Sequence, residues 1–265
     1  MIVKDLILMI QFMTRIPLKL QVETDEESFA RGVVYFPIIG LLIGGFNLIL
    51  YLVVLAVFPK GGTLLAAIFA VLGNLLITGG LHFDGLGDTC DGIFSGRTRE
   101  RMLEIMKDSH IGTFGTLGII MDIALRIGII AGLSGKFAIL GILLSPMVSK
   151  TAVVQLMTVS KYARANGMGG LFLGRLRPIR IMLSFLLGIF LFNAAFPIIM
   201  GNVGLMVQAM LCLSLIVVLF LVLFGFRSWT YGCIGGMTGD TIGAANEVFE
   251  WVFLLFVLFL SGGIL

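Results

Sequence analysis

The sequence predicts an all-α integral membrane protein, a bundle of about seven transmembrane helices, from its composition, its apolar runs and its charge pattern. Hydrophobic residues make up 58% of the 265 residues and charged residues only 12%, whereas an average soluble domain is about 25% charged. Several apolar runs reach the roughly 20 residues that cross a hydrocarbon core about 30 Å thick. The Lys and Arg residues between these runs gather on one side, so the bilayer is the expected solvent.

Seven segments are apolar enough to span when hydropathy is averaged over about 19 residues. The expected spans are 33–58, 63–81, 116–134, 137–160, 181–200, 204–226 and 243–263.

A shorter apolar stretch, Leu6 to Met13, precedes these spans. It has no small-residue cleavage site after it, so it is not expected to be a cleaved signal peptide. Lys4 and Arg15 flank it, and we expect a short helix at the membrane surface.

The basic residues outside the spans set the expected orientation, because cytoplasmic loops carry the excess of Lys and Arg. Only Lys60 and Lys136 fall on one side, and every other such residue falls on the other. The N-terminus is therefore expected to be cytoplasmic. We expect one multi-pass domain, residues 1–265, in the cell inner (cytoplasmic) membrane, with its active site facing the cytoplasm. Its candidate catalytic loops are 82–115, 161–180 and 227–242.

Cysteine spacing and net charge exclude some classes of function. Cys90, Cys212 and Cys233 stand far apart without C-x-x-C spacing, so neither a disulfide framework nor a zinc site is expected. The net charge of +3 does not indicate a nucleic-acid partner. The sequence does not indicate the oligomeric state, because lipid-facing and helix-facing surfaces are both apolar.

The segment from Gly79 to Gly115 carries the strongest chemical signal. Asp84, Asp88 and Asp91 follow one another at i, i+4 and i+7, so their carboxylates share one face if the segment is helical. Three like charges repel unless a cation neutralises them, and Mg²⁺ typically takes one or two carboxylates plus substrate phosphates. We expect all three to be catalytic and to bind Mg²⁺. A solvated acidic loop is the less favoured alternative, because such a loop does not need acids and glycines at a helical period.

Other polar residues in this segment are candidates for substrate binding and proton transfer. Arg97 and Lys107 are expected to bind phosphate, with Asp108 beside them. The alternative is an ordinary amphipathic surface helix with its charges in water or near lipid headgroups. His82 is either a general base or a polar residue at the membrane interface, and the sequence leaves the two equal.

A second acidic stripe enters the last span within 235–250, GGMTGDTIGAANEVFE. Asp240, Glu247 and Glu250 stand at i, i+7 and i+10 and again share a helical face. Acids inside a span are expensive and usually face a cavity or a partner. Glu247 and Glu250 are therefore expected to complete the metal site and Asp240 to bind substrate. The alternative is that both glutamates lie shallow in the interface.

Three further charged positions have less specific interpretations. Arg164, in a basic and glycine-rich segment, is a candidate phosphate ligand, although a positive-inside loop also explains it. Asp122 and Arg126, at i and i+4 inside a span, are expected to pair with each other. Lys150 has no partner within its own helix and is expected to face the cavity.

Together these motifs resemble the cobalamin synthase family, the adenosylcobinamide-GDP ribazoletransferases. The resemblance spans the chain and implies a Mg²⁺-dependent transferase that joins α-ribazole or its 5′-phosphate to adenosylcobinamide-GDP, releases GMP and so completes cobalamin assembly. The implied partners are these small molecules and the lipid bilayer, with no nucleic acid. The segments that carry the resemblance are FMTRIPL, YFPIIGLLIG, GGLHFDGLGDTCDG, EIMKDSHIGTFG, YARANGMG and GGMTGDTIGAANEVFE.

Two other functions share some of these features. A membrane alcohol phosphotransferase that uses a nucleotide-activated lipid precursor also has an Asp-Gly-rich helix and a divalent metal. Its usual D-G-x-x-A-R pattern differs from the D-G-L-G-D that begins at Asp84. An ion-coupled transporter would also place acids in its spans, but no inverted repeat is visible in the sequence.

Overall fold

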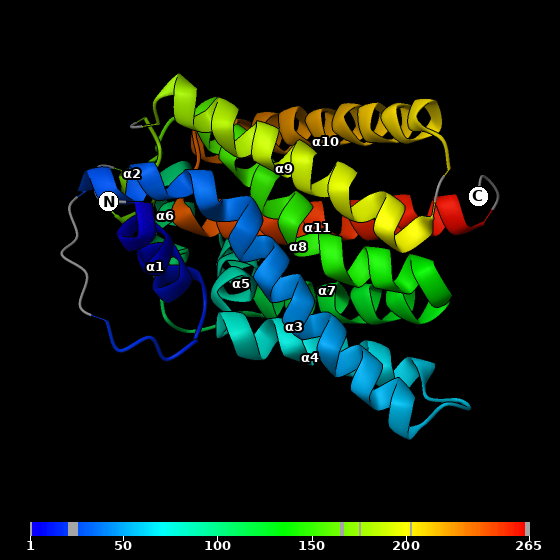
Figure 1. The fold of residues 1–265 in the computed structure, drawn as a ribbon. Coiled ribbons are helices and arrows are strands. Elements are labelled where there is room, and N and C mark those ends of the chain that lie inside the picture. The colour runs from blue at the N-terminus through cyan, green and yellow to red at the C-terminus, as the bar shows by residue number, and fades with distance from the viewer. Residues whose placement is uncertain (1, 21–25, 165–166, 175, 202, 263–265) are drawn as a thin grey trace.

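Every regular element in the described part of the chain is a helix, which confirms the predicted all-α class. The computed structural model describes residues 2–20, 26–164, 167–174, 176–201 and 203–262. Six of its helices are long and apolar enough to cross a membrane, and a seventh span results if α4 and α5 count as one bent span. The elements, shown in Figure 1, are α1 (Ile2–Met13), α2 (Glu26–Gly32), η1 (Val33–Tyr35), α3 (Phe36–Val57), α4 (Thr63–Thr78), α5 (Leu81–Phe94), α6 (Arg99–Ile105), α7 (Thr113–Gly132), α8 (Gly135–Thr158), η2 (Met168–Leu171), α9 (Pro178–Met200), α10 (Leu205–Ile234) and α11 (Gly239–Ser261).

The predicted spans agree with these helices to within a few residues at most ends. The main differences lie in the segments that we expected to be loops. Helices α5 and α6 occupy much of 82–115, and α10 continues as far as Ile234. Hydropathy marks where a helix leaves the apolar core, whereas helical hydrogen bonds continue into the polar region. Residues 165–166 of the YARANGMG motif lie outside the described residues.

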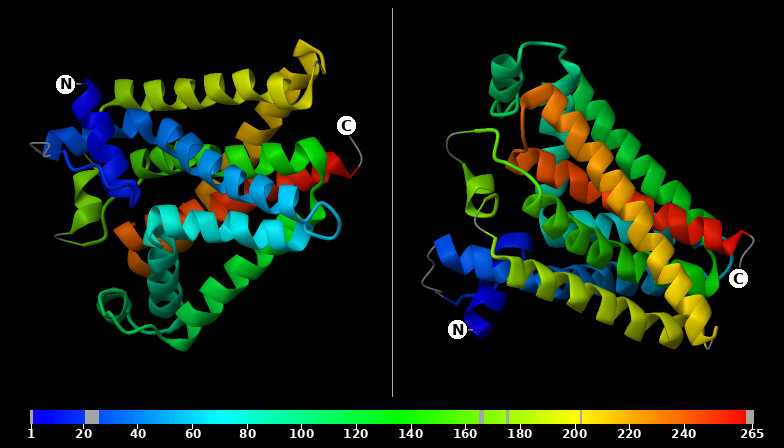
Figure 2. Two further views of the ribbon diagram at one scale, coloured as in Figure 1. Left: turned by 60° about the horizontal axis from the view of Figure 1, so that its bottom comes forward. Right: turned by 90° about the horizontal axis from the view of Figure 1, so that it is seen from above.

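Helix α8 is the centre of the bundle, with 83% of its most apolar window buried. Helices α3, α11 and α9 make its most extensive contacts. Glycine permits the closest of these approaches, because a Cβ atom at Gly44 of α3 would lie 2.0 Å from the Leu143 carbonyl oxygen of α8. Helices α9 and α10 diverge from their connection near the C-terminal end of the bundle (Figure 2).

The N-terminus, α1, α2 and α6 lie at one end of the bundle, and the C-terminus lies at the other (Figure 1). Between α4 and α5 the chain turns by 92° at this first end. Gly79 and Gly80 make the turn in the left-handed region, at φ values of +65° and +75°. Other residues adopt two such successive conformations only with strain, so the glycine pair fixes the direction of the acid-bearing helix.

Candidate active site

A cleft of about 780 Å³, part of which is open to the outside, lies among α1, α3, α5, α8 and α11. Asp84 and Asp240 line one side of it. His82, Lys150 and Asn246 line its deeper part, and side chains such as Phe12, Phe36 and Phe172 form an apolar side. The cleft therefore combines acids, a buried cation and an aromatic surface.

Close contact between α5 and α11 brings together the two acid-bearing segments that the sequence analysis treated separately. A Cβ atom at Gly85 would lie 2.7 Å from the Asp240 carbonyl oxygen, and one at Gly243 would lie 3.4 Å from the Gly85 Cα atom. The first turn of α11 is fixed by a capping box between Thr238 and Thr241. Asp240 is therefore held beside the acidic face of α5.

Asp84, Asp88 and Asp240, which we call the acid cluster, contain more negative charge than their surroundings neutralise. Asp240 forms an ion pair with Arg164 at 3.0 Å. Asp84 and Asp88 have no hydrogen-bond or ion-pair partner among the described residues. Partial burial acts against ionised Asp88, the charges of Asp240 and Asp84 add to this effect, and Arg164 partly offsets it. Such a cluster is stabilised by a cation from outside.

The donor set of the acid cluster suits Mg²⁺ in the manner of a phosphate-transfer site. No group of three or more His, Cys, Asp or Glu side chains in the described part of the chain is arranged to hold a metal ion. Mg²⁺ usually binds through only one or two carboxylates, with water and substrate phosphates completing its octahedron. Asp84 and Asp88, two carboxylates on one helical face without a partner among the described residues, meet that requirement.

The third acid of the predicted stripe, Asp91, has a different role. Its carboxylate accepts hydrogen bonds from the backbone N–H groups of Gly112, at 2.7 Å, and Gly115, at 2.8 Å. These groups belong to the first turn of α7, where unpaired N–H groups and the helix dipole favour a negative charge. Glycine is needed at both positions, because a Cβ atom at either would lie within 2.5 Å of the carboxylate. Asp91 thus joins α5 to α7, and its assignment as a metal ligand stays a prediction.

Asp122 and Arg126 of α7 pair as predicted, with 2.9 Å between Arg126 Nε and Asp122 Oδ2. Arg126 also pairs with Glu247 and, at 2.5 Å, with Glu250, both from α11. With Lys150, these residues form what we call the buried network. All five are at most 2% exposed.

The position of Glu247 and Glu250 differs from both sequence interpretations. They neither lie shallow in the interface nor reach the acid cluster, because Arg126 binds their carboxylates. Asn246 donates hydrogen bonds to both, and Asn74 of α4 donates a further one to Glu250 at 3.1 Å. A carboxylate deep in a bundle requires such compensation, because burial without a partner is strongly unfavourable.

Lys150 faces the cleft, as expected, and links it to the buried network. Its Nζ atom lies 3.3 Å from the Asn246 Oδ1 atom and 3.3 Å from the His82 Nε2 atom. A charged ammonium group has only donors, so Lys150 in its charged form would donate to Nε2 and the proton of a neutral His82 would lie on Nδ1. His82 also lines the cleft.

The remaining predicted substrate ligands lie outside the cleft lining. Arg97 and Lys107 are exposed in the connections on either side of α6. Asp108 is also exposed and accepts a 2.7 Å hydrogen bond from His110, which holds the pKa of Asp108 below its usual range. Arg164 is the one basic residue of the predicted set that reaches the acid cluster.

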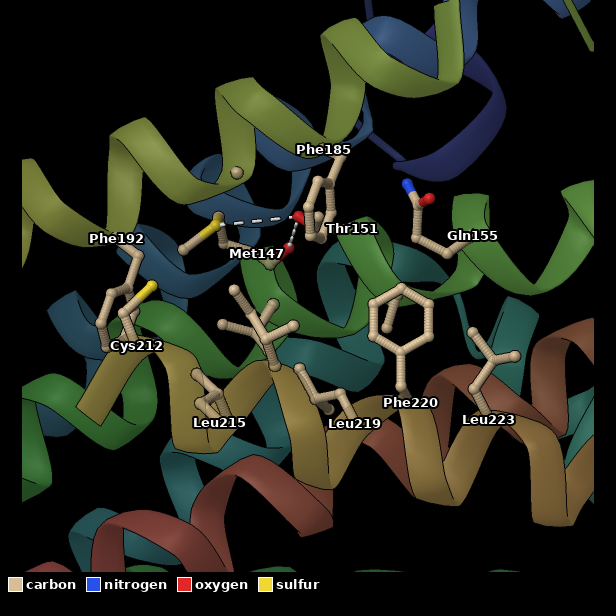
Figure 3. Close-up of a pocket in the computed structure, with 14 residues that line it drawn as sticks. Met147, Thr151, Gln155, Phe185, Phe192, Cys212, Leu215, Leu219, Phe220 and Leu223 are labelled. Carbon is tan, nitrogen blue, oxygen red and sulfur yellow. Dashed lines mark hydrogen bonds between the residues drawn. The ribbon is translucent and has the colours of Figure 1, made fainter. Parts of the chain in front are cut away.

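A second groove, of about 510 Å³, lies between α8, α9 and α10 (Figure 3). Figure 3 shows Phe185, Phe192 and Phe220 around it, with Thr151 and Gln155 as its main polar groups. No charged side chain lines this groove. It is therefore less suited than the cleft to phosphate chemistry.

Sequence reasoning missed the aromatic side of the cleft and the role of Asn246. Phe12, Phe36 and Phe172 come from three distant elements. Phe12 and Phe36 lie in the FMTRIPL and YFPIIGLLIG segments that carry the resemblance, but nothing in these segments indicates that their rings meet. Asn246 lies inside the second acidic motif, so its position next to two glutamates in a span was the available signal.

Fold and site together define a multi-helix membrane protein with an acid-lined cleft at one end of its bundle. A family model described as cobalamin-5-phosphate synthase matches residues 5–258. The chain belongs to this family, which confirms the resemblance seen in its motifs.

Individual relatives agree along nearly the whole length. A Clostridium novyi protein named adenosylcobinamide-GDP ribazoletransferase is 45% identical over 264 residues, which cover 98% of each chain. A Clostridioides difficile protein of the same name is 36% identical over 259 residues, covering 97% of this chain and 98% of its own. No solved structure matches this chain.

Proposed function

We propose that this protein is the transferase that joins α-ribazole or its 5′-phosphate to adenosylcobinamide-GDP and releases GMP, the last assembly step of cobalamin biosynthesis. Family membership over residues 5–258 and the shared name of its relatives support this reaction. The structural observation that supports the proposal most is the acid cluster. Asp84 and Asp88 have no ion-pair partner in the described part of the chain and lie near the Asp240–Arg164 ion pair.

We further propose Mg²⁺ as the cofactor, held by Asp84 and Asp88. When bound there, Mg²⁺ would neutralise the substrate diphosphate and withdraw charge from it. Arg164, oriented by Asp240, is placed to bind a phosphate oxygen and stabilise the departing GMP. A ribose hydroxyl of ribazole attacks the phosphorus on the corrinoid side, and the bond from that phosphorus to the GMP oxygen breaks.

The attacking hydroxyl must lose a proton, and the structure favours a carboxylate of the acid cluster as its acceptor. The Nε2 atom of His82 lies 3.3 Å from the Nζ atom of Lys150. We propose that a charged Lys150 donates to Nε2, so that Nδ1–H of His82 acts as a donor that orients the substrate and not as the general base that the sequence also allows.

The direct test is GMP release by the purified protein in detergent, given adenosylcobinamide-GDP, α-ribazole 5′-phosphate and Mg²⁺. We expect GMP and a new cobamide in equal amounts, lost on addition of EDTA and in Asp84→Asn. Glu100→Gln, an exposed acid on α6, is the matched control and should keep full activity. Folded wild-type protein that forms no GMP would contradict the reaction, and activity that survives EDTA would contradict the metal.

We also propose that the cleft faces the cytoplasm across the cell inner (cytoplasmic) membrane, which the distribution of Lys and Arg supports. In a Cys233→Ser background, single cysteines at Ser109 and Ser134 would report the two sides, since Cys90 and Cys212 are buried. A membrane-impermeant maleimide should label position 134 in intact cells and position 109 only in inverted vesicles. The opposite labelling would reverse the orientation.

A further inference from the structure

The aromatic side of the cleft is built from three parts of the chain that have no sequence motif in common. Phe172, which follows η2, lies at its centre, with its ring centroid 5.8 Å from that of Phe12 and 6.0 Å from that of Phe36. We call these three residues the aromatic wall. Met13 and Met157 extend the apolar surface beside it. Flat apolar rings pack well against such a surface of aromatic and thioether groups.

Charged side chains lie across the cleft from the aromatic wall. Asp84 and Asp240 lie on the side formed by α5 and α11, where Gly85 and Gly243 let the two helices approach closely. A core that served packing alone would not line a cavity that also contains two carboxylates and a lysine. The cleft therefore matches a ligand with a flat apolar end and a polar end rich in oxygen.

Size separates the two substrates of the proposed reaction. The cleft is partly open, and the 780 Å³ of free space includes the solvent at its mouth. A benzimidazole riboside is the smaller substrate, and its flat ring can enter between the helices while the rest of the molecule lies toward the mouth. A corrin ring that carries an adenosyl group and GDP is several times larger, so only its diphosphate can reach the acid cluster from the mouth.

On these grounds, and resting on the proposed function, we propose that the cleft is the ribazole site. The benzimidazole ring packs against the aromatic wall, the ribose lies toward Asp84 and Asp240, and the corrinoid substrate binds outside at the mouth. The wall offers no hydrogen-bond partner to a ring edge. A purine, whose edge would lose its hydrogen bonds to water without replacement, is therefore disfavoured against benzimidazole.

Kinetics and direct binding test this assignment. Phe172→Ala is expected to raise KM for α-ribazole 5′-phosphate about 10- to 100-fold through lost apolar contact, and KM for adenosylcobinamide-GDP less than twofold. Phe172→Leu keeps an apolar side chain and should give a smaller rise. Phe192→Ala, which removes a similarly buried ring of α9 outside the cleft, is the matched control and should change neither KM.

Measurements on the wild-type protein test the proposal even if these variants fail to fold. Free 5,6-dimethylbenzimidazole should compete with α-ribazole 5′-phosphate and not with the corrinoid, and adenine at the same concentration should have no effect. Equilibrium dialysis should show that wild-type protein binds α-ribazole 5′-phosphate without any corrinoid present. Failure to bind, or variants at Phe172 that change KM for the corrinoid instead, would overturn the ribazole site. Wild-type protein that binds ribazole but releases no GMP would instead contradict the reaction.

Discussion

The acid cluster and the buried network contain the same kind of residue in opposite situations. Asp84 and Asp88 form no ion pair with any described residue, whereas Glu247 and Glu250 share the guanidinium of Arg126. The difference follows from depth. At the end of the bundle a metal ion can arrive from water and neutralise the acids, but deep among the helices only the protein can supply the opposite charge. Unpaired acids at an opening therefore indicate function more strongly than acids in a span.

Removal of Arg126 would leave the buried glutamates without their cation, as Asp84 and Asp88 are in the acid cluster. We expect this change to have the largest effect on stability. Arg126→Met leaves three buried carboxylates with only Lys150 to offset them, and we expect the free energy of unfolding to fall by about 3–5 kcal/mol. Thermal unfolding in detergent would measure this. Adding Glu247→Gln and Glu250→Gln should restore part of the loss, since it removes the uncompensated charge. Equal losses in the single and triple variants would contradict the charge argument.

Neutralisation of Asp88 should have the opposite result to the loss of Arg126: activity should fall while stability is kept. Asp88→Asn is expected to lower kcat about 100- to 1,000-fold, because the transition state loses charge stabilisation at the diphosphate. The unfolding temperature without metal should stay the same or rise, since one source of repulsion is gone. GMP release and thermal unfolding on the same sample would measure both. A large fall in stability would instead assign Asp88 to structure.

His82 lies between the acid cluster and the buried network. Two substitutions distinguish a role as hydrogen-bond donor from a role as general base. His82→Ala should lower kcat about 30-fold by removing the donor toward the cleft. In His82→Asn, the amide N–H group replaces the Nδ1–H donor, so activity should stay within about tenfold of wild type. Asparagine cannot accept a proton near neutral pH. If both variants lose activity equally, His82 acts as the base after all.

The smallest effect is expected at the turn that aims α5. Gly79→Ala would place a Cβ atom at φ +65°, in contact with Arg15, and should lower stability by about 1–2 kcal/mol and activity about tenfold as α5 shifts. Gly61→Ala is the matched control. It has φ +78° in the connection before α4, with no atom within 4 Å of its Cβ position. It should lose similar stability and keep its activity, as unfolding and GMP-release assays can show.

The sequence predicted the helices well because each apolar span carries its own signal. It also located Asp84, Asp88, Asp240 and Arg164, all of which the fold gathers at one place. The stripe at i, i+4 and i+7 correctly indicated a helix within a segment that hydropathy marks only as polar.

The pairing of charges between helices could not be predicted in the same way. Glu247 and Glu250 share a helical face with Asp240, but that face is long, and Arg126 of α7 binds only its deeper part. Asp91 is one helical turn from Asp88, yet α7 begins beside it and takes its carboxylate. Periodicity within one helix shows which face a charged side chain occupies. Its ion-pair partner depends on which other helix packs against that face.

The turn at Gly79 has a further consequence for the surrounding lipid. It ends α4 after 16 residues, which rise only about 24 Å, whereas the hydrocarbon core is about 30 Å thick. The outer face of α4, which includes Leu64, Phe69 and Leu76, is exposed and apolar. We therefore expect the membrane beside α4 to be thinner than elsewhere. Activity in reconstituted vesicles should depend on acyl-chain length, with an optimum at shorter chains than a bundle of uniformly long spans would require.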